Sequence, residues 1–467
     1  MLKKNLSNLP GREPEIRRRL IFACFLVVLG GMAGIRARSQ AAAGAAHPAR
    51  RMISSAAAAS ISNLAPASGE IPASLTPSLE RHAQVETGLD VLEAEGFRRL
   101  RGKNVGIVCN QTSVDRHGRH IIDLMTAAGI HVVALFSPEH GIRGAVDESV
   151  ESSVDAKSGL KVYSLYDVSR PRPWRYRPSP QMLKGVDTLV FDIQDVGARF
   201  YTYLATLGYV MESAAEQHIP LIVLDRPNPL GGLDVEGPLL EPRYFSFAGF
   251  HTMPIIYGMT IGELAGLFNV EKHLGTDLEV VKMRGWNRRL LYDQTGLPWV
   301  NPSPNIRSTR EAELYPGVGL LEDLPISVGR GTDAPFERVG APWIDGAKLA
   351  NNLNARRMAG VSFGPTRFTP RSSIYRGREC HGVKILLRDR RHFHPVSMGI
   401  EIADALANLY PAVINERTLK RMTGMAGTGS VPTAIACHQS PAAIVNSWRS
   451  DENAWRVRRK PFLLYPG

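Results

Sequence analysis

Acidic and polar side chains follow apolar stretches of this sequence at three places. Glu139 and His140 follow one stretch, Asp192 and Asp195 follow a second, and Asp225 follows a third. Two carboxyl groups can hydrolyse a glycosidic bond, because one donates a proton to the leaving oxygen while the other acts as base or nucleophile. The residue types therefore favour a hydrolase, provided that the fold brings these groups to one place.

Four short apolar runs predict buried β-strands, at residues 104–109, 130–136, 186–193 and 219–224. Helical patterns separate them, at 118–128 and at about 201–217. Apolar runs without alternation, separated by helices, indicate a parallel sheet covered on both faces, which is a doubly wound α/β domain. Ligands bind beyond the carboxyl ends of the strands in such sheets, so we expect the acids to share one edge.

Sequence motifs for several common chemistries are missing. No G-x-G-x-x-G follows the first predicted strand, and Walker A, H-E-x-x-H and G-x-S-x-G do not occur. These absences disfavour a dinucleotide-binding enzyme, a P-loop NTPase, a zincin and an α/β-hydrolase. We therefore expect no cofactor.

The formal net charge of +12 is concentrated at the N-terminus. Residues 1–43 contain eight Lys or Arg and two acids, which accounts for half of that charge. The rest is small for the length of the chain, and no basic stripe with interleaved aromatic side chains is present. Nucleic acid is therefore not an expected partner.

The first residues have the pattern of an export signal. Three arginines at 17–19 precede an apolar run, 20–32, and then small residues. The run is shorter than the roughly 20 residues of a spanning helix, so we expect cleavage without a stable membrane span, and a periplasmic or secreted protein. The predicted signal peptide is 1–43, and an Ala/Ser/Pro-rich flexible linker, 44–84, follows it.

The rest of the chain is predicted to form two domains. Residues 85–300 form the α/β domain with the candidate acids. Residues 301–467 form a smaller α+β domain, with a strand at 382–387 and a helix at 397–409. Residues 423–431 are rich in Gly, Ser and Thr, and we expect a break there before a short basic tail.

Several blocks of residues resemble a known family. They are SPEHG at 137–141, LVFDIQDVGARFYTY at 189–203, LDRPNPLGG at 224–232, VEGP at 235–238, TGLPW at 295–299, SPN at 303–305, GRGTDAPF at 329–336 and GAPWID at 340–345. In this order, the blocks resemble the NamZ-type exo-β-N-acetylmuramidases of bacterial cell-wall recycling.

The resemblance implies a Rossmann-like catalytic domain, a smaller second domain and an active cleft between them. It also implies a glycoside hydrolase that releases N-acetylmuramic acid from the non-reducing end of peptidoglycan fragments. The expected partners are therefore peptidoglycan-derived saccharides or muropeptides, and no metal is expected.

Glu139 is the first candidate for the proton donor, because partial burial beside a turn would favour its neutral form. Most of the support comes from the SPEHG match, and the alternative is a carboxylate that stabilises a helix N-terminus. Asp192 and Asp195 are candidates to position a water or the 2-acetamido group, with mutual repulsion raising one pKa. Alternatively, one of them caps a helix that begins near Arg199. Glu337 is a rival catalytic partner from the second domain.

Muramic acid carries a lactyl carboxylate, which a guanidinium group would bind well. The candidate arginines are Arg143, Arg199 and Arg330, although each could instead pair with a strand-end acid. Other contacts to the sugar are expected from His140, from the ring of Tyr201 and from the amide of Asn305.

Two other interpretations stay open. Asp192, Asp195, Asp225 and His140 could ligate a hard cation in a metal-dependent hydrolase. A non-catalytic muropeptide-binding protein would share the fold without turnover. The preferred interpretation of Asp225 itself is a residue that organises its loop by accepting hydrogen bonds from backbone amides.

Overall fold

The computed structural model describes residues 84–142, 152–167, 169–171 and 174–467. All of them fall within the unit His82–Gly467. The predicted signal peptide, the predicted linker up to residue 83, and Arg143 lie outside the described residues. Within the described part of the chain, no helix has both the length and the apolar character needed to cross a membrane.

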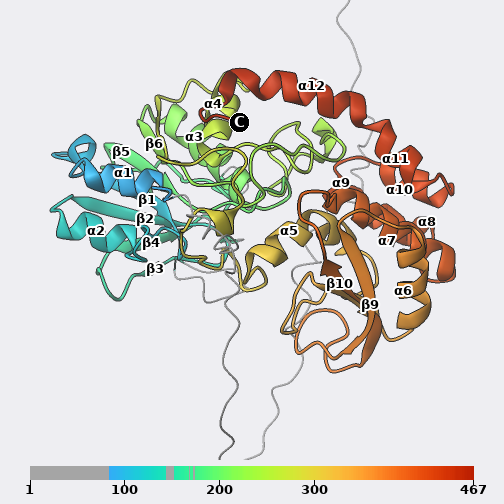
Figure 1. Cartoon of the computed structure of the whole chain (residues 1–467). Helices are drawn as coiled ribbons and strands as arrows, with labels where there is room; N and C mark the ends of the chain where they lie inside the picture. The colour runs from blue at the N-terminus through green and yellow to red at the C-terminus, as the bar shows by residue number, and fades with distance from the viewer. Residues whose placement is uncertain (1–83, 143–151, 168, 172–173) are drawn as a thin grey trace, which may run out of the picture. The chain divides into compact units, whose positions relative to one another are not determined.

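A seven-stranded sheet forms the first half of the described chain (Figure 1). Its order is β3-β4-β2-β1-β5-β6-β7, and neighbouring strands are parallel except β3 with β4. This order confirms the predicted doubly wound α/β architecture. The strands are β1 (Val105–Cys109), β2 (Val132–Ser137), β3 (Ser153–Val154), β4 (Lys161–Ser164), β5 (Thr188–Asp192), β6 (Leu221–Leu224) and β7 (Leu278–Val281).

Alternate residues of the central strands enter two separate hydrophobic cores. Ile107, Val190 and Ile222 belong to one core, and Val108, Phe191 and Val223 belong to the other. Because both faces of these strands are buried, their sequences are continuously apolar, which made β1, β2, β5 and β6 predictable. Strands β3, β4 and β7 contain exposed residues and lack that signal.

Four helices accompany this sheet: α1 (Gly88–Ala94), α2 (Ile121–Ala127), α3 (Tyr203–Glu216) and α4 (Ile261–Glu271). Thr87 and Thr260 begin α1 and α4 with capping boxes, in which the threonine hydroxyl accepts from a backbone N–H and an acid three residues later accepts from the threonine N–H. These caps satisfy backbone donors that the first helical turn leaves without partners.

Strand β1 is where the strand order reverses. Strands β2 and β4 lie on one side of it, and β5, β6 and β7 lie on the other. The carboxyl ends of β1, β2 and β5 therefore frame the place where sheets of this kind bind ligands. Glu139 follows β2, Asp192 ends β5 and Asp195 comes three residues later.

A smaller antiparallel sheet follows, with the order β8-β10-β9. This lobe confirms the predicted smaller α+β unit, and the predicted strand and helix lie within β10 and α7. Its elements are β8 (Arg338–Ala341), β9 (Val361–Phe368), β10 (Cys380–Leu387), α5 (Thr309–Val318), α6 (Gly346–Ala355) and α7 (Pro395–Leu409).

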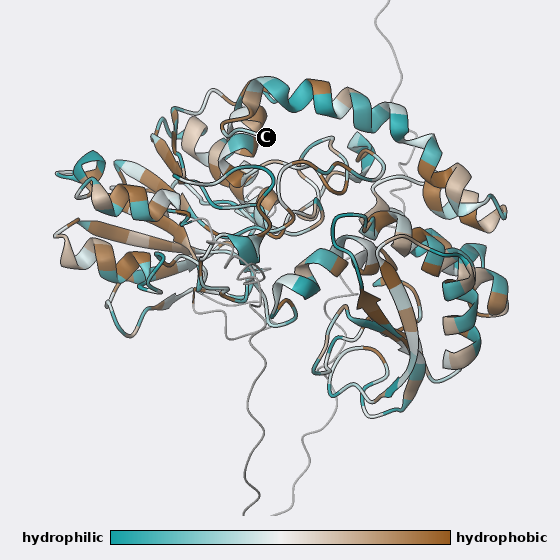
Figure 2. Cartoon of the chain, viewed as in Figure 1, coloured by the Kyte–Doolittle hydropathy of each residue, from teal (hydrophilic) through white to brown (hydrophobic). Residues whose placement is uncertain are grey.

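The segment expected to be a break and a basic tail is helical, which corrects that prediction. Gly427 ends one short helix in the left-handed conformation, and Val431 and Ile435 of the next helix are buried. Trp455 is buried too, and its Nε1 donates to the carbonyl oxygen of Tyr257 at 2.9 Å. The final helix is hydrophilic along most of its length (Figure 2). The helices are α8 (Glu416–Leu419), α9 (Thr423–Ala426), α10 (Ser430–Ala436), α11 (Pro441–Ser447) and α12 (Arg449–Arg459).

Short 3-10 helices complete the secondary structure. They are η2 (Arg98–Leu100), η4 (Pro242–Tyr244), η5 (Tyr292–Gln294), η6 (Gly319–Leu321), η7 (Lys420–Met422) and η8 (Lys460–Phe462).

Helices α5 and α7 meet at two glycines. A Cβ at Gly317 would collide with the carbonyl oxygen of Pro395, and one at Gly399 would collide with that of Gly317. We expect Gly317→Ala to lower the free energy of unfolding by about 2 kcal/mol or more, because the helices must separate. Urea denaturation measures this change.

Gly266 in α4 provides the matched control. Its added Cβ would meet Phe462 at 3.9 Å, an ordinary contact. Gly266→Ala should therefore raise the free energy of unfolding by roughly 0.5 kcal/mol through helix propensity. Equal effects of the two substitutions would contradict the close packing of α5 and α7.

Candidate active site

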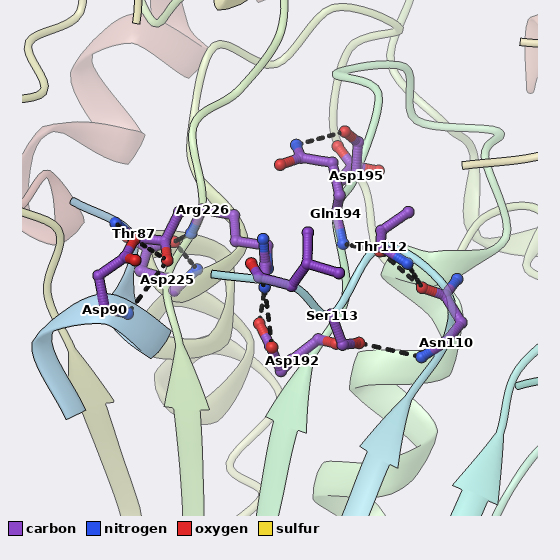
Figure 3. A network of polar contacts seen from close by, with 12 residues as sticks. Thr87, Asp90, Asn110, Thr112, Ser113, Asp192, Gln194, Asp195, Asp225 and Arg226 are labelled. Carbon is purple, nitrogen blue, oxygen red and sulfur yellow. Dashed lines mark hydrogen bonds and ion pairs between the residues drawn. The ribbon is translucent and has the colours of Figure 1, made fainter. Parts of the chain in front are cut away.

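Polar side chains at the carboxyl ends of β1 and β5 bond to one another (Figure 3). The Thr112 hydroxyl donates to Asn110 Oδ1 at 2.6 Å, and the same hydroxyl accepts from the backbone N–H of Gln194 at 2.9 Å. Ser113 Oγ accepts from the backbone N–H of Asn110 at 3.0 Å and donates to the backbone oxygen of Asp192. These bonds hold the two strand-end loops in one arrangement.

Asp192 is fully buried and forms an ion pair with Arg226, which is buried as well. Arg226 Nε donates to Oδ1 at 2.6 Å and Nη2 donates to Oδ2 at 2.8 Å. Burial raises the pKa of Asp192, and the charge of Arg226 opposes that rise. Both carboxylate oxygens are therefore occupied by the protein. Asp192 thus has a partner inside the protein, and its expected role toward a water or the acetamido group stays a prediction.

Asp195 is also buried, with a different set of partners. Its Oδ2 accepts from the backbone N–H of Gly197 at 2.7 Å and from the hydroxyl of Tyr257, whereas Oδ1 has no hydrogen-bond partner. Burial raises the pKa of Asp195 to about 6, so repulsion from Asp192 is not its cause. The bond to Gly197 lies in the loop before α3, which begins at Tyr203, so Asp195 does not cap that helix.

Asp225 organises its loop, as one interpretation of the sequence predicted. It accepts from the backbone N–H of Gly262 at 2.8 Å, from the Thr260 hydroxyl at 2.7 Å and from the Tyr465 hydroxyl at 2.5 Å. Burial raises its pKa to about 7. The structure therefore uses this acid to join β6, α4 and a residue near the end of the chain.

Glu139 differs from these three acids because it is only half-buried. Thr202, immediately before α3, donates its hydroxyl to Oε2 at 2.9 Å. Burial raises the pKa of Tyr166, and the negative charge of Glu139 raises it further. The two side chains therefore lie near each other. His140 and Gly141 have φ values of 71° and 76°, and this left-handed pair turns the chain just after Glu139. His140 is half-buried beside it.

Tyr201 lies among other aromatic rings. Its ring centroid is 4.8 Å from that of Tyr203 and 5.9 Å from that of Tyr315, both edge-to-face. The side chain is buried, so its ring does not form the open stacking platform that the sequence suggested. The Tyr203 hydroxyl donates to the carbonyl oxygen of Pro302 at 2.6 Å. Pro302 also accepts from Gln111 just after β1, so the aromatic cluster reaches the sheet edge.

Arg199 is buried and does not lie at the rim of a site, which corrects its predicted role. Its Nη1 donates to the carbonyl oxygens of Pro238 and Met253, and its Nη2 donates to those of Met425 and Ala426, all at 2.7 to 2.9 Å. Burial lowers its pKa to about 9. The guanidinium group connects segments distant in sequence through both of its Nη atoms.

The remaining predicted residues belong to the second lobe or to the segment leading into it. Arg330 forms an ion pair with Glu322 and lies over the ring of Phe336, 5.2 Å from its centroid. Glu337 is half-buried, with Oε2 4.0 Å from Nη1 of Arg310.

The segment with Asn305 contacts the end of β1. Gln111, just after β1, donates from Nε2 to the carbonyl oxygens of Asn301 and Pro302, at 2.8 and 3.1 Å. Asn305 is buried in this segment, and its backbone N–H donates to Ser303 Oγ. The structure thus brings Asn305 toward the same edge as Glu139.

Buried polar atoms without a hydrogen-bond partner gather at this edge. Each costs about 1–3 kcal/mol, so a group of them is typical of a place where a ligand supplies partners. The sequence showed the polar residue types after each strand but not which atoms lack a partner. Within the described residues, the atoms at this edge are Asn110 Nδ2, Gln111 Oε1, Ser137 Oγ, Gln194 Oε1 and Asp195 Oδ1.

The three aspartates that were candidates to bind a metal ion do not form a set of metal ligands. Within the described residues, no group of three or more His, Cys, Asp or Glu side chains is arranged to hold a metal ion. Asp192, Asp195 and Asp225 bond instead to Arg226, Tyr257 and Tyr465, respectively. Their carboxylates are turned to different partners.

Two surface hollows lie elsewhere on the molecule. One, of about 480 Å³, is lined by Ile142, residues 153–157 and Val162, and the other, of about 420 Å³, is lined by residues around Leu183 and Ile219. Neither contains a predicted catalytic residue.

Comparison with known proteins gives matches along both halves of the chain. Residues 105–310 match the family model described as exo-β-N-acetylmuramidase NamZ, N-terminal, and residues 313–465 match its C-terminal counterpart. The peptidoglycan β-N-acetylmuramidase NamZ of Bacillus subtilis (strain 168) is 42% identical over 385 residues, covering 82% of this chain and 92% of that protein.

Solved structures are similar as well. A DUF1343 family protein from Bacteroides fragilis NCTC 9343 has a TM-score of 0.76 and 36% identity, and a second one has 0.66 and 32%. Each comparison covers 82% of this chain and 99% of the other.

The ion pair of Asp192 and Arg226 can be tested by measuring the free energy of unfolding of variants. Arg226→Met leaves a buried carboxylate without its partner, and we expect this to lower the free energy of unfolding by about 3–5 kcal/mol. Adding Asp192→Leu removes the stranded charge and should restore most of the loss. Urea denaturation of both variants measures the difference. A double variant no more stable than Arg226→Met would refute the structural role assigned to Asp192.

Proposed function

The chain belongs to the NamZ family of exo-β-N-acetylmuramidases, and on that premise we propose that Glu139 is the proton donor of its reaction. The reaction releases N-acetylmuramic acid from the non-reducing end of peptidoglycan fragments. Water supplies the hydroxyl group that ends on the anomeric carbon, and the leaving oxygen gains a proton. A carboxylic acid beside that oxygen supplies the proton.

Family membership confirms the resemblance identified in the sequence, and with it the predicted glycoside hydrolase. The observation that supports Glu139 is its exposure. Asp192, Asp195 and Asp225 are buried, whereas Glu139 is half-buried and its side chain accepts a hydrogen bond from Thr202. A proton donor must reach the substrate, and Glu139 is the strand-end acid among these four that meets that requirement.

For the second group we propose Asp195. It lies at the same sheet edge as Glu139, and its Oδ1 has no protein partner. Its role would be to orient the attacking water or the 2-acetamido group, because Tyr257 and Gly197 hold the other oxygen in place. Glu337 lies beside the smaller sheet, where its backbone oxygen accepts from Ile385, and we rank it after Asp195.

Glu139→Gln should lower turnover of an N-acetylmuramyl disaccharide by about 10²-fold or more, because the amide cannot donate the proton. The loss should be smaller with 4-nitrophenyl N-acetylmuramide, since nitrophenolate leaves without protonation. Steady-state kinetics on both substrates measure this difference. Glu416→Gln, at an exposed acid on α8, is the control and should be unchanged.

Two results would contradict the proposal in different ways. Undiminished turnover by Glu139→Gln would refute the proton-donor assignment. A folded wild-type protein that binds muramides without turning them over would instead point to a non-catalytic muropeptide-binding protein.

We also propose that the protein is exported. The support is the arginine triplet at 17–19, the apolar run 20–32 and the small residues after it, which together match the order of an export signal. Export would place the enzyme in the periplasm or the medium, where peptidoglycan fragments occur.

Removing residues 2–43 should keep the protein in the cytoplasm of an expressing bacterium, because the export machinery no longer recognises it. Cell fractionation and immunoblotting of the full chain and the shortened chain measure the distribution. The full chain found only in the cytoplasm would overturn the proposed export.

A further inference from the structure

Three exposed arginines lie on the loop between β9 and β10: Arg371, Arg376 and Arg378. We call residues 371–378 the basic tip. Within the described residues, none of these guanidinium groups forms an ion pair, and the nearby acids Asp333 and Glu379 pair with Arg338 and His381 instead. The basic tip therefore presents positive charge that no ion pair neutralises among the residues described by the structure.

The backbone of the basic tip is held in an uncommon conformation. Ser373 and Tyr375 have φ values of 66° and 62°, in the left-handed region that non-glycine residues seldom adopt. Backbone bonds close the loop, from Gly377 to Pro370 at 2.8 Å and from Arg378 to Tyr375 at 2.9 Å. Strained residues of this kind cluster at ligand-binding sites, so the conformation itself points to a function.

The side chain of Tyr375 anchors the tip. Its hydroxyl donates to the carbonyl oxygen of Pro325 at 2.8 Å and accepts from Trp343 Nε1 at 3.2 Å. Trp343 packs edge-to-face on Tyr410, with centroids 5.2 Å apart. An anchored loop loses little conformational freedom when its arginines bind a ligand.

The basic tip lies against the glycine-rich loop 329–336. The backbone N–H of Arg371 donates to the carbonyl oxygen of Gly331 at 2.8 Å. A Cβ at Gly331 would lie 2.6 Å from the backbone nitrogen of Ser372, so only glycine allows this approach. The two loops therefore form one surface.

Contacts connect this surface to the edge that contains Glu139. Arg307 Nη2 donates to the carbonyl oxygen of Thr332 at 2.6 Å, and the segment just before Arg307 contacts Gln111 at the end of β1. Phe336 of the glycine-rich loop packs on Tyr315, which packs on Tyr201. The loops of the second lobe are thus fixed relative to the strand ends.

Two of the three arginines first expected to bind the lactyl carboxylate have other partners. Arg199 is buried among carbonyl oxygens, and Arg330 is paired with Glu322. Arg143 lies outside the described residues. The basic tip supplies guanidinium groups that are both exposed and without an acidic partner.

We propose that the basic tip binds the carboxylate of muramyl residues in the substrate, an inference that rests on the proposed function. Guanidinium groups bind carboxylates through two parallel hydrogen bonds, which gives both attraction and orientation. The carboxylate comes either from the terminal muramyl residue that is released or from one further along the fragment. Either source uses the same chemistry.

The test replaces Arg371, Arg376 and Arg378 together by Gln. The control replaces three exposed arginines elsewhere by Gln, Arg101, Arg417 and Arg449, so that the net charge changes equally. Thermal unfolding verifies that both proteins fold. kcat and KM are measured with 4-nitrophenyl N-acetylmuramide, with its carboxamide and with a tetrasaccharide that contains two muramyl residues.

We expect kcat/KM of the tip variant to fall about tenfold or more, mainly through KM, because hydrogen bonds to a charged group are lost. A fall with the free-acid muramide and none with the carboxamide assigns the contact to the terminal residue. A fall with the tetrasaccharide alone assigns it to a residue further along. Kinetics equal to those of the control on all substrates overturn the proposal.

Calorimetric titration with free N-acetylmuramic acid and with N-acetylglucosamine separates this proposal from the proposed function. If the wild-type protein shows no turnover, the proposed function is refuted. Calorimetry would still test whether the basic tip binds a muramyl carboxylate. Preference for muramic acid that disappears in the tip variant supports carboxylate binding. Preference that is unchanged in the variant refutes binding of the terminal carboxylate, and the tetrasaccharide kinetics then decide whether the tip binds one further along the fragment.

Discussion

A carboxylate removed from water needs protein donors, and this requirement shapes the edge of the large sheet. Asp192 takes two donors from Arg226, and Asp225 takes donors from Thr260, Gly262 and Tyr465. These bonds tie the loops after β5 and β6 to α4 and to the last part of the chain. Glu139, by contrast, is half-buried, whereas Asp192 and Asp225 are held inside the fold. In Asp195, Oδ2 accepts hydrogen bonds, whereas Oδ1 has no partner within the described residues.

Much of the fold could be predicted because its central strands are buried on both faces. Residues such as Ile107 and Val108 enter opposite cores, so β1 is apolar throughout and stands out in the sequence. Strand β7 could not be found in this way, because residues such as Glu279 are exposed. The helices after residue 411 were missed for a different reason. Four of them are only four to seven residues long, and α12 is largely polar, so none shows a long apolar period.

The sequence predicted where the polar residues of the site gather, but not which contacts each of them makes. Strand order places Glu139, Asp192 and Asp195 at one edge, and the residue types alone indicated that edge. Which acid faces outward depends on partners such as Arg226 and Tyr257, and local sequence does not reveal those pairings. Arg199 shows the same difficulty, since it lies in a matched block yet binds four carbonyl oxygens inside the protein. The basic tip was not predicted, because its interest comes from its backbone conformation and from nearby acids that pair with Arg338 and His381 instead.

The bonds from residues 464 and 465 to the large sheet have a consequence for biosynthesis. The backbone N–H of Leu464 reaches Glu263, and the Tyr465 hydroxyl reaches Asp225. On the ribosome, the strand that precedes Asp225 emerges more than two hundred residues before these donors are made. During that interval the nascent sheet lacks part of the support for its buried acid, so the large sheet cannot reach its final packing until residues 464 and 465 have joined it.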